Sequence, residues 1–139
     1  MRPESIFLPV AALALWTCVF MFWMGYRRIS AVRGRKLKPS DFRIGESAAV
    51  PPEMTLLNRH FMNLLEMPVL FYVACLAFYV THQTSPGVVW LAVAFVVSRF
   101  AHSWVHLRTN NILHRVIVFA ISNLILLAMW VWFVERVLF

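Results

Sequence analysis

Four long apolar stretches alternate with short polar segments along the chain. They cover residues 6–26, 54–80, 88–107 and 112–133. Each reaches the roughly 20 residues that an α-helix needs to cross about 30 Å of hydrocarbon. The first stretch is longer than the apolar core of a secretory signal and is followed by arginines, not by a small-residue cleavage site. The pattern therefore predicts four membrane-spanning helices, and the first is expected to stay attached.

The composition favours a bilayer over water as the solvent of this fold. Apolar residues make up 61% of the 139 residues and charged residues 14%, whereas soluble domains are about 45–50% apolar. A chain this short has too little interior to hide that much apolar surface from water. We therefore expect an all-α fold, an integral membrane four-helix bundle. Because the sequence shows no internal repeat and no long linker, residues 1–139 are expected to form a single domain.

Charge is divided unevenly among the connections between the predicted helices. The chain has 13 Lys and Arg against 6 Asp and Glu, a net charge of +7. The first connection holds most of this excess, in Arg27, Arg28, Arg33, Arg35, Lys36, Lys38 and Arg43, against Asp41 and Glu46. The second connection, residues 81–87, has no Lys or Arg, and the third carries Arg108 and Arg115. The positive-inside rule then places the first and third connections in the cytoplasm and both termini outside it. Orientation and lipid headgroups account for the basic residues, so nucleic acid is not an expected partner.

Several polar or aromatic residues need only a structural role. Cys18 and Cys75 lie inside apolar stretches, where they are expected to be small buried hydrophobes, not a disulfide. His60, His82 and His114 lie near predicted membrane boundaries, where we expect exposed imidazoles. Most tryptophans are expected to form belts at the two membrane surfaces, among them Trp16, Trp23, Trp104, Trp130 and Trp132.

The second apolar stretch contains a polar stripe. Arg59, Asn63 and Glu66 are spaced i, i+4, i+7, which places them within about 60° of one another on a helix. Ionisable groups inside a span face a partner or a water-filled cavity, not lipid. Pro68 follows two residues after Glu66, removes one backbone donor and is expected to kink this helix.

The third apolar stretch has a matching stripe of Arg99, His102 and His106. The short turn at residues 81–87 makes the second and third helices antiparallel. Glu66 lies 15 residues before this turn and Arg99 lies 12 after it, so the two differ in depth by about 5 Å. The geometry therefore allows an ion pair between Glu66 and Arg99, and such a pair could be a purely structural clasp.

His102 and His106 are spaced i, i+4, a separation that suits a metal ion or haem. No acidic or cysteine ligand joins them at a recognisable spacing. We therefore expect no metal site and interpret the two histidines as hydrogen-bonding groups at a helix interface. A haem or metal protein stays as an alternative, which colour or bound metal in the purified protein would reveal.

The polar residues, taken together, resemble those of the MAPEG family, the membrane-associated proteins in eicosanoid and glutathione metabolism. The resemblance rests on Arg59-x-x-x-Asn63-x-x-Glu66 with Pro68 and Phe71, then Arg99-x-x-His102 and Arg115. It implies a homotrimer with glutathione as co-substrate, held between neighbouring subunits near the cytoplasmic face. One protomer also has little interior in which to shelter several charged groups.

The resemblance also implies roles for these residues. Arg115 matches the catalytic arginine of the family, where a permanent cation favours the thiolate over a thiol whose pKa is about 8.5 when free. Arg59 would bind a carboxylate, Asn63 the peptide, and Glu66 the ammonium or Arg99. The implied glutathione-binding set is Arg59, Asn63, Glu66, Arg99, His102 and His106. A hydrophobic substrate would reach the thiolate from the lipid.

Three positions depart from the family pattern. Met62 stands where glutathione-using members often have a second arginine, His106 where a tyrosine is common, and Val116 where the prostaglandin synthase type has a serine. The resemblance thus implies a membrane glutathione transferase or peroxidase acting on hydrophobic electrophiles or lipid hydroperoxides. A non-catalytic binding or accessory protein on the same scaffold is the alternative. The compact loops resemble the bacterial branch of the family, which would place the chain in a bacterial inner membrane.

Overall fold

The computed structural model describes residues 2–34, 37–42, 50–109 and 111–139, and every regular element in these segments is helical. Arg35, Lys36, Arg43 and Glu46 of the basic first connection lie outside the described residues. The elements are η1 (Pro3–Ile6), α1 (Phe7–Arg33), η2 (Pro39–Phe42), α2 (Pro52–Leu65), α3 (Met67–Val80), α4 (Pro86–Trp104), η3 (Val105–Thr109) and α5 (Ile112–Leu138). The all-α prediction is confirmed.

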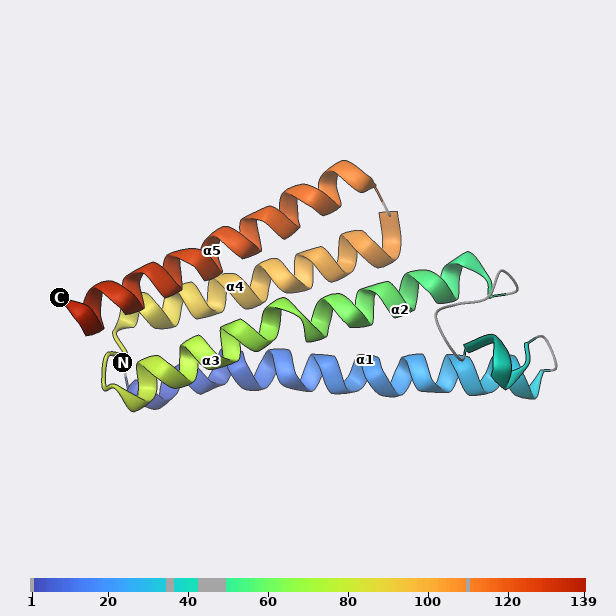
Figure 1. Cartoon of the computed structure of the whole chain (residues 1–139), viewed down its shortest axis with the longest axis horizontal. Coiled ribbons are helices and arrows are strands. Elements are labelled where there is room, and N and C mark those ends of the chain that lie inside the picture. The colour runs from blue at the N-terminus through green and yellow to red at the C-terminus, as the bar shows by residue number, and fades with distance from the viewer. Residues whose placement is uncertain (1, 35–36, 43–49, 110) are drawn as a thin grey trace.

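Four of the helical segments are long and apolar enough to cross a membrane. They are Pro3–Arg33, Pro52–Val80, Pro86–Arg108 and Ile112–Val137, in good agreement with the four predicted spans. Figure 1 shows them as long rods lying side by side, with both chain termini at one end of the bundle. The η2 turn of the first connection and the η3 turn lie at the opposite end. Residues near the ends of α1 and α4 and the starts of α2 and α5 therefore share one end of the bundle.

The second span is not one continuous helix. It is broken at Glu66, whose backbone angles are φ −82° and ψ −82°, so that α2 ends at Leu65 and α3 begins at Met67. Pro68 has no N–H to donate to the carbonyl of Leu64, which explains why the helix breaks here. The predicted kink is confirmed, and the carbonyls of the last turn of α2 become available to other donors.

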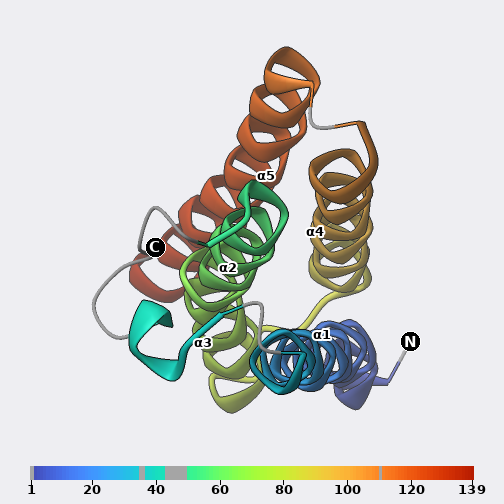
Figure 2. The same cartoon turned by 90° about the vertical axis from the view of Figure 1, so that its right-hand side faces the viewer.

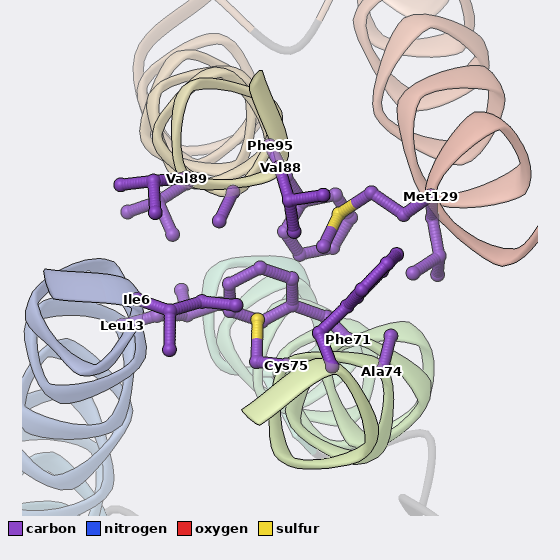
Figure 3. Close-up of a cluster of buried hydrophobic side chains, with 13 residues drawn as sticks. Ile6, Leu13, Phe71, Ala74, Cys75, Val88, Val89, Phe95 and Met129 are labelled. Carbon is purple, nitrogen blue, oxygen red and sulfur yellow. The ribbon is translucent and has the colours of Figure 1, made fainter. Parts of the chain in front are cut away.

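The hydrophobic core lies in the half of the bundle that holds the termini. Figure 3 shows Leu13, Phe71, Cys75, Phe95 and Met129 meeting at its centre, each fully buried. Phe71 and Phe95 stack with their ring centroids 4.5 Å apart, which joins α3 to α4. Cys75 is therefore the small buried hydrophobe that its sequence context predicts.

Cys18, in contrast, is exposed, so the prediction that it is buried is wrong. The inward face of α1 is defined by Leu13, Phe20 and Met24, and Cys18 lies on another face of the helix. Many other large apolar side chains also point outward, including Leu124 at 63% exposure. Such outward apolar faces are suited to lipid or to a partner subunit.

Candidate functional site

The polar stripe on α2 points away from the rest of the protomer. The buried face of α2 is formed by Leu57, His60 and Leu64. On the other side, Arg59 and Glu66 are exposed and Asn63 is partly buried. The stripe therefore forms one helix face, as predicted, and its charged side chains are available to groups outside the protomer.

The polar stripe on the third span points inward. Arg99 and His106 are 0% exposed and His102 is 2% exposed. Arg99 Nη2 donates a hydrogen bond to the backbone carbonyl of Asn63. His106 Nε2 lies 3.3 Å from the carbonyl oxygen of Leu56, and because a carbonyl only accepts, this contact requires the tautomer with the proton on Nε2. The two contacts hold this span against α2 over about two helical turns.

The contact of Arg99 with Asn63 differs from the ion pair that the sequence allows between Arg99 and Glu66. The hydrogen bond of Nη2 goes to a carbonyl in the last turn of α2, which the helix break leaves without its usual donor. Glu66 lies at the break with an exposed side chain, and its charge still acts on Arg99. Among the described residues, Arg99 Nε and Nη1 have no hydrogen-bond partner. The buried guanidinium thus keeps donors for a further group.

Three histidines form a buried cluster beside Arg99. The ring centroid of His60 is 5.1 Å from that of His106 and 6.3 Å from that of His102, and the last two rings are 5.7 Å apart. His60 is 0% exposed, so the prediction of an exposed imidazole at the membrane boundary is wrong. The signal for its burial was present in the sequence, because His60 shares a helix face with Leu57 and Leu64.

The cluster is rich in nitrogen atoms and poor in partners. In the part of the chain that the structure describes, both ring nitrogens of His60 and the Nδ1 atoms of His102 and His106 have no hydrogen-bond partner. A neutral imidazole can donate from one nitrogen and accept at the other, whereas the Arg99 guanidinium can only donate. An acceptor such as a carboxylate or thiolate would match these donors.

Two phenylalanines that the sequence did not single out enclose the cluster. Phe20 of α1 meets the His60 ring edge-on at 4.7 Å between centroids. Phe119 of α5 lies 5.8 Å from the ring of His102, and the Arg99 Cζ atom lies 5.9 Å from the Phe119 centroid. Four helices therefore contribute to this cluster. Phe119 follows Arg115 by four residues, which is the spacing that could have identified it as part of the site.

Arg115 lies in the first turns of α5, at the edge of this cluster. Asn111 caps the helix, because its side-chain oxygen accepts hydrogen bonds from the backbone N–H groups of Leu113 at 3.0 Å and His114 at 3.3 Å. Arg115 is partly exposed, and its charge acts on both His102 and His106. The cap determines where α5 begins and so which helical turn presents Arg115 to the cluster.

The structure thus divides the predicted site residues into two groups. Arg99, His102 and His106 belong to the buried cluster, and Arg115 lies beside it. Arg59, Asn63 and Glu66 extend outward along α2, although the charge of Arg59 still acts on His106. The elements that carry them, α2, the end of α4 with η3, and the start of α5, lie in the half of the bundle that holds η2, where Figure 1 shows α5 diverging from the other helices.

The described residues contain no group of three or more His, Cys, Asp or Glu side chains arranged to hold a metal ion. What they do provide is permanent positive charge next to imidazoles in a water-poor interior. In such an environment an anion interacts more strongly with a cation than it does in water. The charge and the donors of this cluster are therefore chemically suited to an acidic group, such as a carboxylate or a thiolate.

Comparison with known protein families agrees with this arrangement. The family model described as MAPEG family matches residues 6–134. No curated protein and no solved structure matches the chain significantly. The matched region covers nearly all of the 139 residues, including every candidate site residue. The chain therefore belongs to the MAPEG family of membrane proteins, which are associated with eicosanoid and glutathione metabolism.

Proposed function

We propose that this protein is a membrane-bound glutathione transferase or peroxidase. In this proposal a glutathione thiolate attacks a hydrophobic electrophile or reduces a lipid hydroperoxide. The observation that carries it is the proximity of Arg99 and Arg115 to a buried histidine cluster, several of whose nitrogens have no hydrogen-bond partner among the described residues. Membership of the MAPEG family supports the same class of chemistry.

The distribution of charge suits the functional groups of glutathione. Its two carboxylates call for guanidinium donors, which Arg59 on α2 and Arg99 in the buried cluster provide. The exposed Glu66 carboxylate suits the ammonium group, and the side chain of Asn63 suits the peptide link. Arg115 would lie beside the sulfur, where its positive charge favours the thiolate, the form that acts as nucleophile.

The proposed assembly is a homotrimer with one domain per subunit. Arg59 and Glu66 are exposed on a helix whose other exposed residues include Met62 and Leu65. Charged side chains at this position would be costly against lipid. A neighbouring subunit would cover the stripe and complete a site that is open in one protomer. The exposed apolar side chains along α5 offer this neighbour an apolar surface.

The proposed orientation places the site near the cytoplasm. The basic first connection and the candidate site lie at the same end of the bundle. The positive-inside rule therefore puts this end, with the third connection, on the cytoplasmic side of the membrane, which the resemblance to the bacterial branch of the family suggests is a bacterial inner membrane. Both termini would then lie on the opposite side. Glutathione dissolved in the cytoplasm would reach the thiol site directly, and the hydrophobic co-substrate would arrive through the bilayer.

A non-catalytic binding or accessory protein is the second candidate. It is favoured by His106, which stands where a tyrosine is common, is fully buried and contacts the carbonyl of Leu56. That contact commits the side chain to holding two helices together. Met62, where a second arginine often occurs, is 48% exposed and contributes no charge.

Glutathione binding to the detergent-solubilised protein distinguishes the two candidates. A transferase or peroxidase is expected to give binding heat with millimolar glutathione and to gain thermal stability. A glutathione concentration of 100 times the dissociation constant would raise the free energy of unfolding by about 2.7 kcal/mol. Arg59→Ala is expected to weaken the binding, whereas Arg2→Ala, which removes an exposed arginine at the other end of the bundle, is the matched control. No heat and no stabilisation in the wild-type protein would support the accessory role.

A further inference from the structure

An aromatic groove runs along the outside of the bundle between α1 and α4. It encloses about 460 Å³, and its walls include Trp16, Trp23, Phe100, Trp104, Leu107 and Arg108. Trp104 is 64% exposed and Trp23 is 40% exposed, so the groove opens outward. Figure 2 shows α1 and α4 on one side of the bundle and α2 on the other, which separates the groove from the polar stripe on α2.

The groove changes from apolar to cationic along its length. At its deeper end Trp16 meets Phe100 edge-on, with ring centroids 5.5 Å apart. Trp23 and Leu107 each come seven residues later in sequence, about 10 Å farther toward the first connection. There the Cζ atom of Arg108 lies 5.3 Å from the centroid of Trp104.

A second cation lies at the same end. The Cζ atom of Arg27 is 5.9 Å from the ring centroid of Trp23, which lines the groove. Both guanidiniums are thus held against tryptophan faces, which orders them near the mouth of the groove. The described residues that line the groove include no Asp or Glu. An occupant that matches this surface therefore has a hydrocarbon chain and an anionic head at one end.

We propose that the groove binds one anionic phospholipid of the surrounding bilayer. Its acyl chain would lie against Trp16, Phe100 and Trp104, and its phosphate would lie between Arg27 and Arg108. A second copy of the chain is a poorer match, because it has only 6 Asp and Glu among 139 residues with which to meet two arginines. A zwitterionic headgroup would bring its own ammonium toward the same cations.

The groove is distinct from the candidate thiol site, although α4 contributes to both. Arg99 and His102 face the interior of the bundle, whereas Phe100 and Trp104 face outward. The proposal therefore does not depend on the proposed glutathione chemistry. A phospholipid in the groove would also add contacts between α1 and α4 and so stabilise the helix that carries the buried cluster.

Native mass spectrometry of the intact assembly, titrated with lipids of identical chains, tests the proposal. The wild-type protein is expected to bind phosphatidylglycerol more tightly than phosphatidylcholine. Arg108→Ala is expected to weaken phosphatidylglycerol binding about fivefold, because one arginine near the membrane surface contributes about 1 kcal/mol. Lys38→Ala, which removes an exposed cation at the same end of the bundle outside the groove, is expected to leave it unchanged.

A second pair of variants tests the apolar wall. Trp104→Ala is expected to weaken binding of both lipids, whereas Trp90→Ala removes an equally exposed tryptophan from α4 outside the groove and serves as the control. Equal losses of phosphatidylglycerol affinity in Arg108→Ala and Lys38→Ala would indicate that diffuse surface charge attracts the lipid, which would overturn the proposal. So would tighter binding of oleate than of phosphatidylglycerol, which would assign the groove to a free fatty acid. Crosslinking of Trp104 to a second subunit would assign the groove to a subunit interface instead.

Discussion

Arg99 on α4 hydrogen-bonds the backbone carbonyl of Asn63, in the last turn of α2. The break at Glu66 deprives this turn of its usual donors, and a buried carbonyl left without one costs about 1–3 kcal/mol. The guanidinium meets that need while remaining fully buried itself. A single contact therefore connects the helix break to the buried histidine cluster, and it explains why the arginine lies inside the bundle.

Removal of Arg99 is expected to destabilise the fold. Arg99→Ala leaves the Asn63 carbonyl without a donor and opens a cavity beside the histidines, which together should cost about 2–4 kcal/mol. The midpoint of thermal unfolding in detergent measures the effect. Arg59→Ala, which removes an exposed arginine from α2, is expected to change the midpoint little. Equal midpoints for the two variants would contradict the structural role assigned to Arg99.

Pro68→Ala is expected to repair the helix break. The alanine restores an N–H that can donate to the Leu64 carbonyl, so α2 and α3 would join into a straighter helix. Slower hydrogen exchange of the amides around Glu66 would report this change. Because the repair also supplies donors to the end of α2, Arg99 is expected to lose part of its contact, and turnover should fall. Unchanged exchange rates would show that another feature causes the break.

Arg115→Ala and Arg59→Ala are expected to impair the proposed reaction in different ways. If Arg115 stabilises the thiolate, its loss should lower turnover by about ten- to a thousandfold, or about 1.4–4 kcal/mol at the barrier, with glutathione affinity within a few-fold of wild type. Loss of Arg59, a carboxylate anchor, should instead raise the dissociation constant and leave saturated turnover largely intact. The measurements are turnover, calorimetry and thiolate absorbance at about 240 nm.

The oligomeric state of each variant provides the control for this comparison. Native mass spectrometry of each variant should show the wild-type assembly, which is expected to be a trimer. This control is needed because a disrupted interface would impair binding and turnover together. An Arg115→Ala protein that keeps the wild-type assembly, turnover and thiolate signal would exclude Arg115 from the catalytic role.

His60→Phe is expected to stabilise the protein. Both ring nitrogens of His60 are buried without a partner among the described residues, and Phe20 already packs edge-on against the ring. A phenylalanine keeps the aromatic contact and removes the cost of the buried polar atoms, about 1–3 kcal/mol. The unfolding midpoint should therefore rise. A lower midpoint would show that the imidazole makes hydrogen bonds in the membrane.

The proposed topology predicts opposite locations for two reporter fusions. A reporter that works only outside the cytoplasm should be active after Phe139, and one that works only inside the cytoplasm should be active near Lys38. The reason is that the first connection carries most of the positive charge. Paired fusions to alkaline phosphatase and a fluorescent protein measure both locations. Cytoplasmic activity of the Phe139 fusion would reverse the orientation.

The amino-acid sequence alone predicts the four spans, the kink at Pro68 and the two polar stripes. These features depend on local properties: the length of an apolar run compared with the bilayer, the missing N–H of proline, and the helical period of about 3.6 residues. The resemblance that led to the MAPEG family also depends on residue order along the chain. Each of these features is visible before any two helices are packed together.

Which side chains contact one another depends on how the helices pack. The exposure of Cys18 and the choice of the Asn63 carbonyl over Glu66 as partner of Arg99 were not evident from spacing. The packing of Phe20 against His60 was not evident from spacing either. The physical reason is that helical periodicity shows which residues share a face, whereas burial and pairing depend on which neighbouring helix covers that face and at what depth.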